Sequence, residues 1–126
     1  MASEPHPFCG EIRIEQLEVS ARIGVPEEER ATAQRLIVSI SFWPHQQACD
    51  LDDKIDQTVN YSAVAEETKS FVSHQSISLI ETLADRLAMH LLKTFPIQKI
   101  ALEVRKFALE DAKYVSANVT RNASVC

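Results

Sequence analysis

The chain has 126 residues, of which 45% are apolar and 25% are charged, and its formal net charge at pH 7 is −5. This length fits one domain, and the composition is that of a folded globular protein and not of a disordered chain. A protein that grips the nucleic-acid backbone needs clustered positive charge, so the acidic balance argues against nucleic acid as a partner.

Neither a membrane nor an oxidising compartment is indicated. No apolar run approaches the roughly 20 residues of a membrane span, and Glu4, Pro5, His6 and Pro7 stand where a signal peptide would need an apolar core. The three cysteines are Cys9, Cys49 and Cys126, and this odd, widely spaced set suggests neither a disulfide framework nor a zinc site. We therefore expect a cytoplasmic protein with reduced thiols and no membrane partner.

The pattern predicts a loose tail over residues 1–9, one domain over residues 10–122 and a short tail over residues 123–126. The first strand covers residues 11–23, with apolar residues on alternate positions. The alternation changes parity midway, because Ile12 and Ile14 are even whereas Leu17 and Val19 are odd. Since strand side chains alternate between faces, the change indicates a bulge near Glu15-Gln16 or a switch of the buried face.

Further elements follow in order. A polar loop covers residues 27–33, and a second strand over residues 34–45 forms an antiparallel pair with the first. Apolar residues at helical spacing then predict a helix beginning after the N-cap Asn60, and a second, longer helix beginning near Ser78. His74-Gln75-Ser76 breaks the pattern between them. Two more alternating segments, at residues 100–106 and 115–119, predict the last strands.

The expected order is thus ββααββ, which indicates an α+β domain with one four-stranded antiparallel sheet and two antiparallel helices on one face. The other face of such a sheet must be solvated or covered by a partner, and its long strands leave edges that need protection. Joining several sheets edge to edge in a ring meets both needs. The pattern therefore favours a symmetric homo-oligomer.

Metal binding is not indicated by the four histidines, which are His6, His45, His74 and His90. The sequence has no HxH, HxxxH or CxxC pair of the kind that zinc sites use, so we expect no metal and no cofactor. His90 falls beside the main apolar stripe of the second helix, which favours a surface position.

Four features carry possible chemistry, each with a plainer alternative. Lys106 ends an apolar strand face, so its amine is either a desolvated base or a lysine snorkelling at the sheet rim. Glu81 either closes a capping box with Ser78 or grips a ligand. Tyr61 lies on the inner stripe of its helix, in the core or an interface. The run Glu27-Glu28-Glu29-Arg30 has the composition of a solvated turn.

Taken together, these segments resemble the dihydroneopterin aldolase family from about Ile12 to Arg121. The matching motifs occur in the family's order: Ile23-Gly24-Val25 with Glu29-Arg30 and Gln34, then Asp56-Gln57-Thr58-Val59-Asn60-Tyr61, then Ser78-Leu79-Ile80-Glu81-Thr82-Leu83-Ala84, and finally Val104-Arg105-Lys106 with Ala112 and Val115. The resemblance implies the tunnelling fold, in which ββααββ subunits join their sheets into a barrel. It also implies a homo-oligomer, either an octamer of two stacked four-subunit rings or a tetramer.

The resemblance further implies a small-molecule pterin substrate and a role for six residues. Glu81 would anchor the pterin's amino group and N3–H, and the backbone of Ile80 would help to hold the ring. Lys106 would move the proton of the side-chain hydroxyl, with Glu29 nearby. Tyr61, supplied by a neighbouring subunit, would handle the proton of the enol-like intermediate, and Val59 would line the pocket across the interface.

The implied reaction is a metal-free retro-aldol cleavage of 7,8-dihydroneopterin in folate biosynthesis, giving 6-hydroxymethyl-7,8-dihydropterin and glycolaldehyde. One alternative is the related dihydroneopterin triphosphate 2'-epimerase, which shares most site residues; another is a ring protein that binds pterin without turnover. The acidic loops favour the unphosphorylated substrate, unless Arg22, Arg30 and Arg105 converge. Phe107 stands where the family often has proline after the lysine, a departure that bears on how Lys106 is placed.

Overall fold

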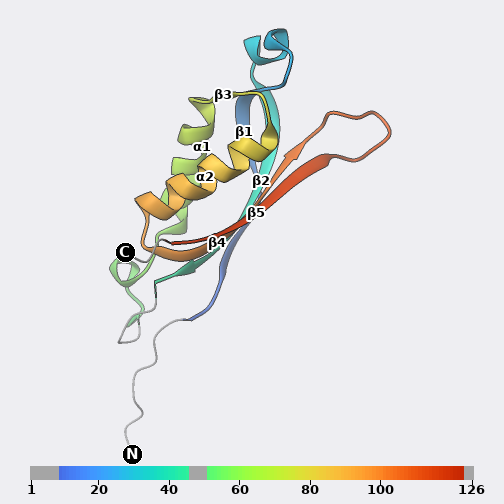
Figure 1. The fold of residues 1–126 in the computed structure, drawn as a ribbon. Coiled ribbons are helices and arrows are strands. Elements are labelled where there is room, and N and C mark those ends of the chain that lie inside the picture. The colour runs from blue at the N-terminus through green and yellow to red at the C-terminus, as the bar shows by residue number, and fades with distance from the viewer. Residues whose placement is uncertain (1–8, 46–50, 124–126) are drawn as a thin grey trace, which may run out of the picture.

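The structure is a computed structural model that describes residues 9–45 and 51–123 (Figure 1). The predicted ββααββ order is confirmed. The predicted tails lie outside the described residues apart from Cys9 and Ala123, and so do His6, Cys49 and Cys126. The elements in chain order are β1 (Ile12–Ile23), the 3-10 helix η1 (Glu27–Ala31), β2 (Gln34–Pro44), the 3-10 helix η2 (Ile55–Gln57), α1 (Tyr61–Ser73), β3 (Ser76–Ile77), α2 (Ile80–Thr94), β4 (Ile97–Lys106) and β5 (Val115–Asn122).

The four long strands form one antiparallel sheet, as predicted, and their order in it is β1-β2-β4-β5. The sheet nevertheless has five strands and not four, because the short β3 pairs in parallel with the end of β1, placing Arg22 opposite Ser76 and Ile23 opposite Ile77. The residue pattern of this segment indicates only a break between the helices. A strand of two residues shows no alternation, so only its long-range pairing reveals it.

The predicted bulge in β1 is confirmed. The pairing between β1 and β2 shifts register between Ile14 and Leu17, and Gln16 has a left-handed φ of 55°. The Gln16 N–H is 3.0 Å from the Ser39 hydroxyl oxygen, to which it donates. Because the extra residue restores the parity, Ile14 and Leu17 both pack against the core.

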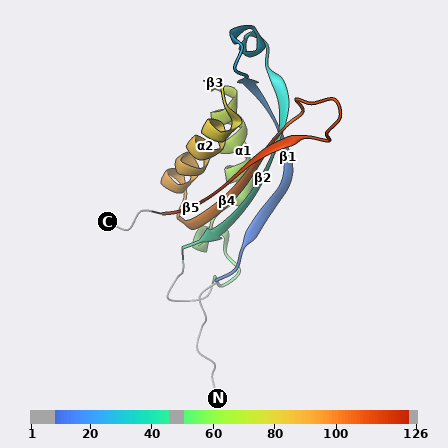
Figure 2. The same cartoon turned by 45° about the vertical axis from the view of Figure 1, so that its right-hand side comes forward.

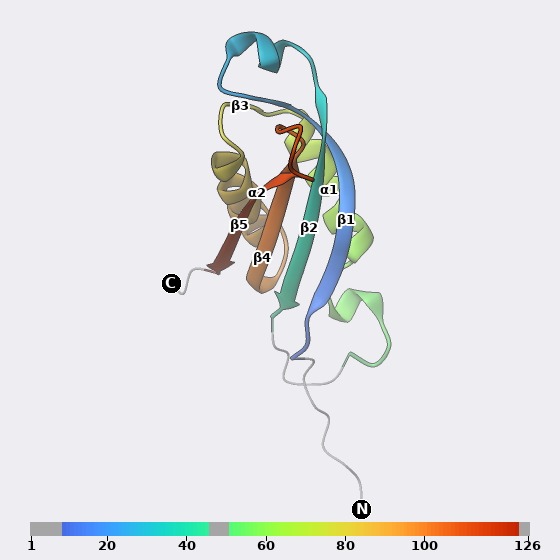
Figure 3. The ribbon, with the colours of Figure 1, turned by 90° about the vertical axis from the view of Figure 1, so that its right-hand side faces the viewer.

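The two helices cover one face of the sheet, α1 over β1 and α2 over β4 and β5 (Figures 2 and 3). The Asn60 cap is confirmed, since its Oδ1 accepts a hydrogen bond of 2.9 Å from Ser62 N–H. The predicted Ser78–Glu81 capping box is wrong, because α2 begins one residue later than the box requires. Its N-cap is Leu79, which makes no side-chain cap bond.

The core fills the space between the helices and the facing side chains of the sheet. Strand residues at alternate positions and the inner faces of both helices are fully buried, chiefly Leu36, Val38, Ile40, Phe42, Val64, Val72, Leu83, Leu87, Leu91, Ile100 and Val104. Each such side chain contributes about 1.5–3 kcal/mol through the hydrophobic effect. The opposite face of the sheet is mostly polar, with Arg13, Glu15, Ser39, Ser41, Glu103, Asn118 and Thr120 around a shallow hollow. In this chain, then, the uncovered face is one that water can solvate.

The sheet has two ends that matter for the site. β4 has ten residues, starting at Ile97, opposite Pro44, and ending at Lys106. At about 3.3 Å per residue these ends are roughly 30 Å apart. The α1–β3–α2 connection lies at the Lys106 end, because β3 pairs with the end of β1 and Gly24 N–H donates to the Ile77 carbonyl at 3.1 Å. No helix within the described ranges has the length and apolar character needed to cross a membrane.

Candidate active site

An ion pair between Lys106 and Glu29 occupies one end of the sheet. Lys106 Nζ is 2.9 Å from Glu29 Oε2, and the two side chains are 15% and 36% exposed. Lys106 is the last residue of β4 and Glu29 lies in η1, between β1 and β2. The alternative of a snorkelling lysine at the rim is therefore wrong, since the ammonium turns inward to a carboxylate and does not extend into water.

Gln34, the first residue of β2, holds the same carboxylate from a second side. Its side-chain Nε2 donates to Glu29 Oε2 at 3.1 Å and to the Ile23 carbonyl at 2.8 Å. The hydrogen bond from Lys106, reinforced by that from Gln34, lowers the pKa of Glu29 below its usual 4.5, although partial burial opposes this. Glu29 is thus a carboxylate at neutral pH, and it faces the Lys106 ammonium.

Gly24 lies against the Glu29 side chain on a third side. It has a φ of +147°, and a β-carbon built on it would lie only 2.7 Å from Glu29 Cγ and closer still to the carboxylate. A side chain at this position would be both strained and in collision with Glu29. The bare backbone of Gly24 is therefore what allows Glu29 to lie against it.

Arginines fix the loop that carries Glu29. Arg30 Nη1 donates to the carbonyls of Gly24 at 2.7 Å and Val25 at 3.1 Å, and it lies 3.4 Å from the Ser78 hydroxyl oxygen just before α2. Arg22 donates to the carbonyls of Arg30 and Ala31. The solvated-turn interpretation thus fits Glu27 and Glu28, which are exposed, and is wrong for Glu29 and Arg30, whose side chains organise the loop.

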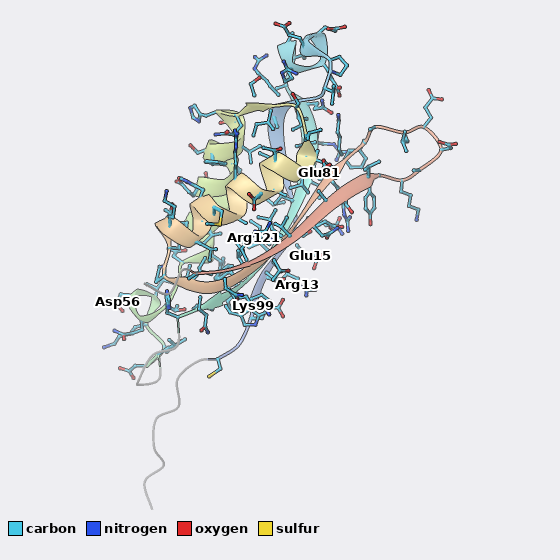
Figure 4. All side chains as sticks on the ribbon, viewed as in Figure 1. Arg13, Glu15, Asp56, Glu81, Lys99 and Arg121 are labelled. Carbon is cyan, nitrogen blue, oxygen red and sulfur yellow. The ribbon has the colours of Figure 1, made fainter. Side chains whose placement is uncertain are left out.

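Glu81 and Ile80 lie in the first turn of α2, close in the chain to Ser78 and therefore at the Lys106 end of the sheet. Figure 4 shows Glu81 at the end of α2 nearer the β4–β5 hairpin. Ile80 is half-buried and Glu81 is exposed. With no cap to form, the Glu81 carboxylate beside the unpaired N–H groups of a helix start offers acceptors and donors on one surface.

Tyr61 and Val59 lie at the opposite end. Val59 is buried and lines a small hollow together with Pro44, Thr58 and Pro96, at the Ile97 end of β4. Tyr61 begins α1 two residues later and is 59% exposed, so the core alternative for its ring is wrong. Figure 4 shows Asp56, which precedes both residues, at the far end of the molecule from Glu81. Within one chain, the six predicted site residues therefore fall into two groups separated by about the length of β4.

The phenylalanine after Lys106 leaves the lysine in place. Lys106 is held by strand pairing, opposite Val115 in β5, so proline is not needed to order its backbone. Phe107 is 45% exposed and lies beneath the Arg35 guanidinium, with 4.7 Å from the guanidinium carbon to the ring centroid. A contact of this kind also fixes the start of the β4–β5 loop.

Of the described histidines, His45 lines the same hollow as Val59, and the His74 ring nitrogen Nδ1 contacts the Ser70 carbonyl at the end of α1. His90 is not the surface residue that its position in the helix suggested: its side chain is half-buried between α1 and α2, stacked on Phe71 at 4.3 Å, with Nε2 2.7 Å from Glu67 Oε1. Among residues 9–45 and 51–123, no group of three His, Cys, Asp or Glu side chains is placed to hold a metal ion.

Comparison with known proteins agrees with this architecture. The family model for dihydroneopterin aldolase matches residues 12–120. Dihydroneopterin aldolase of Streptomyces coelicolor is 30% identical over 95 residues, covering 75% of this chain and 80% of its own; that of Escherichia coli is 32% identical over 94 residues, covering 74% and 76%. The crystal structure of the E. coli enzyme in complex with neopterin superposes with a TM-score of 0.79 at 27% identity, over 90% of this chain and 99% of that one.

Proposed function

The chain belongs to the dihydroneopterin aldolase family of folate biosynthesis, and we propose that it cleaves 7,8-dihydroneopterin at a site shared between two chains. The products are 6-hydroxymethyl-7,8-dihydropterin and glycolaldehyde. The observation that carries the proposal is the Glu29–Lys106 pair, with its Gly24 and Gln34 supports, at the same end of the sheet as the start of α2. This arrangement puts Lys106, which would move a proton, at the same end of the sheet as Glu81, which would anchor the pterin ring.

The reaction needs a base, an acid and an electron sink. Removal of the proton from the 2'-hydroxyl lets the C1'–C2' bond break, and glycolaldehyde leaves with C2' as its aldehyde carbon. The bonding electrons pass into the C=N bond of the dihydropterin ring, which gives an enol-like intermediate. Protonation at C1' then restores the C=N bond and gives the hydroxymethyl product, so the protein supplies positioning and two proton transfers.

We assign the two transfers to the two groups of residues. Lys106, with the Glu29 carboxylate 2.9 Å from its Nζ, moves the proton of the 2'-hydroxyl directly or through a water molecule. Glu81 accepts hydrogen bonds from the 2-amino group and N3–H of the ring, a pairing that suits the two oxygens of a carboxylate, while the backbone of Ile80 holds the ring edge.

Tyr61 and Val59 enter the site from a second copy of the chain, with the phenol handling the proton of the intermediate. The distance between the two groups of residues supports this, because one chain cannot bring them together without unfolding. Apart from the two residues of β1 that pair with β3, the outer edges of β1 and β5 have no strand partner in the described part of the chain. We propose a homo-oligomer, an octamer of two four-membered rings or a single tetramer, acting in the cytoplasm.

The contacts of the arginines favour the aldolase over the triphosphate 2'-epimerase. Arg22 and Arg30 donate to backbone carbonyls. Arg105 is 2.8 Å from Glu103 and stacks over Tyr114 at 4.2 Å. The donors of all three guanidinium groups are thus engaged within the chain, which favours the substrate without a triphosphate.

The test is to incubate the purified protein with 7,8-dihydroneopterin and, separately, with its triphosphate, and to resolve the products chromatographically. Release of 6-hydroxymethyl-7,8-dihydropterin mainly from the unphosphorylated substrate supports the aldolase. Formation of a 2'-epimer mainly from the triphosphate would move the assignment to the epimerase. Bound pterin with no product from either substrate would leave a binding protein without turnover.

A further inference from the structure

Within the proposed active site, we infer that Gln34 is a positioning residue, which holds the Glu29 carboxylate in register with Lys106 so that the pair can serve the proton transfer. The expected effect of Gln34 on turnover rests on the proposed function. The contact between Gln34 and Glu29 is present in the folded chain whatever the reaction is. None of the roles assigned above to the six site residues involves Gln34.

The geometry of the amide is what points to this role. Gln34 Nε2 carries two N–H groups, and they meet two different acceptors, Glu29 Oε2 at 3.1 Å and the Ile23 carbonyl at 2.8 Å. The second bond anchors the amide to the end of β1, and this anchoring orients the first bond. Glu29 therefore depends on a fixed donor attached to the sheet, although its own backbone lies in the η1 loop.

The same Glu29 oxygen, Oε2, accepts from both Gln34 and Lys106. Without the amide, Gly24 would still leave room for the carboxylate but would not direct it, because a bare backbone only avoids a collision. Glu29 is 36% exposed, so its side chain is free to rotate toward water once a donor is lost. Lys106 would then face an acceptor of variable position, and a misplacement of about 1 Å is costly in catalysis.

The charged and titratable side chains that surround Glu29 are few. Lys106 is its ion-pair partner, and Arg30, the next residue in η1, turns to the carbonyls of Gly24 and Val25. Glu27 and Glu28 are exposed on the same turn. Removal of the Gln34 amide therefore removes a neutral donor and leaves these charges unchanged. Any effect on the pKa of Glu29 then comes from the lost hydrogen bond and not from a change in net charge.

The test replaces Gln34 by methionine, which keeps the length of the side chain and removes both donors, in the full-length protein. Gln98→Met is the matched control, because Gln98 Nε2 also donates to a backbone carbonyl, that of Pro44 at 3.1 Å, but at the other end of the sheet. We expect Gln34→Met to lower kcat about tenfold with KM changed less than about twofold. We also expect the acid limb of its kcat–pH profile to move to higher pH, because the Gln34 hydrogen bond is one of the contacts that lower the pKa of Glu29.

A second readout does not depend on turnover. In protein labelled with carbon-13 at the glutamate carboxyl, the Glu29 resonance, assigned with Glu29→Gln, reports its titration directly. We expect its pKa to rise in Gln34→Met, to rise further in the isosteric Gln34→Glu because a second carboxylate is added, and to stay unchanged in Gln98→Met.

The outcomes separate this inference from the proposed function. If the wild-type protein does not cleave dihydroneopterin but the Glu29 pKa still follows this order, the proposed function fails and the positioning contact stands. If Gln34→Met retains the wild-type kcat, pH profile and Glu29 pKa, the positioning role is wrong. Equal effects of Gln34→Met and Gln98→Met would also overturn it, because a general loss of stability would then explain both. Gln34→Glu serves in place of Gln34→Met if the methionine variant does not fold.

Discussion

The Glu29 carboxylate lies where a side chain of residue 24 would have to be. Because Gly24 has no β-carbon, Glu29 packs against its backbone and reaches Lys106. Glu29 lies within η1, five positions after Gly24, so a backbone property of one residue fixes where the side chain of the other can lie. This glycine thus does more than end a strand, because it leaves room for the Glu29–Lys106 pair.

We expect Gly24→Ala to lower both stability and turnover. The positive φ of residue 24 costs a non-glycine residue about 1–3 kcal/mol, and the new methyl group displaces Glu29. Thermal unfolding measures the first effect and kcat the second. The control is Val25→Ala, at a neighbouring side chain that is 67% exposed, which should leave both near wild type. A Gly24→Ala enzyme with full kcat would show that the position of Glu29 is unimportant.

We expect Lys106→Met to abolish cleavage while retaining pterin binding. General acid–base groups contribute about 10²–10⁴-fold, so kcat should fall by at least about a hundredfold. The Kd for neopterin, measured by fluorescence titration, should change little, because Glu81 and not Lys106 is the proposed anchor of the ring. Lys69→Met removes an exposed lysine that pairs with Glu66 on α1 and should be silent in both assays. Wild-type turnover in Lys106→Met would refute the assigned proton transfer.

The pKa of Glu29 also links stability to pH. Since hydrogen bonds from Lys106 and Gln34 hold this pKa below 4.5 in the folded protein, Glu29 stabilises the fold above about pH 4.5, and the contribution is lost as the pH falls through the folded-state value. The gap in melting temperature between wild type and Glu29→Gln should therefore be widest above about pH 5 and narrow below it. Glu27→Gln, exposed on the same turn, should give a gap that is small throughout. An equal narrowing in both variants would contradict the linkage.

We expect Glu81→Gln to weaken pterin binding with little effect on folding. Hydrogen bonds to a charged group contribute about 1.5–3 kcal/mol each, so loss of the charge should raise Kd by about tenfold to a hundredfold. No side-chain cap is lost, because Leu79 is the N-cap of α2, and the remaining helix-dipole effect is only about 0.3–1 kcal/mol. Glu66→Gln, on the exposed surface of α1, is the control. Unaltered pterin affinity in Glu81→Gln would leave Glu81 without a binding role.

Local sequence patterns predicted most of the fold. Alternating residues identified the long strands, and the parity change at Glu15-Gln16 identified the bulge, because the extra residue of a bulge lets apolar residues of opposite parity point to the same face. The parts that sequence patterns missed depend on distant pairing. β3 exists only because two residues meet the end of β1, and Ser78 does not cap α2 because the helix begins after Leu79.

The candidate site was less accessible to sequence reasoning. Pattern alone could not separate the snorkelling and desolvated readings of Lys106, since the decisive partner, Glu29, lies 77 positions away in a loop that had the composition of a solvated turn. Gln34 was noted only as part of a motif, because nothing in a single sequence indicates which acceptors an amide will meet. The family resemblance suggested the six residues, and the fold divides them between two ends of the sheet.

A site shared between chains is tested most directly by combining two variants that are each inactive. Lys106→Met lacks the group at one end of the sheet and Tyr61→Phe lacks the group at the other, so each variant alone should form almost no 6-hydroxymethyl-7,8-dihydropterin. Co-expressed in equal amounts, the two chains should assemble interfaces that hold both wild-type residues. Random mixing at such head-to-tail interfaces restores about a quarter of the sites. Recovery of cleavage to about that level is the expected result, whereas mixed assemblies that stay as inactive as either variant would show that Lys106 and Tyr61 do not serve a common site.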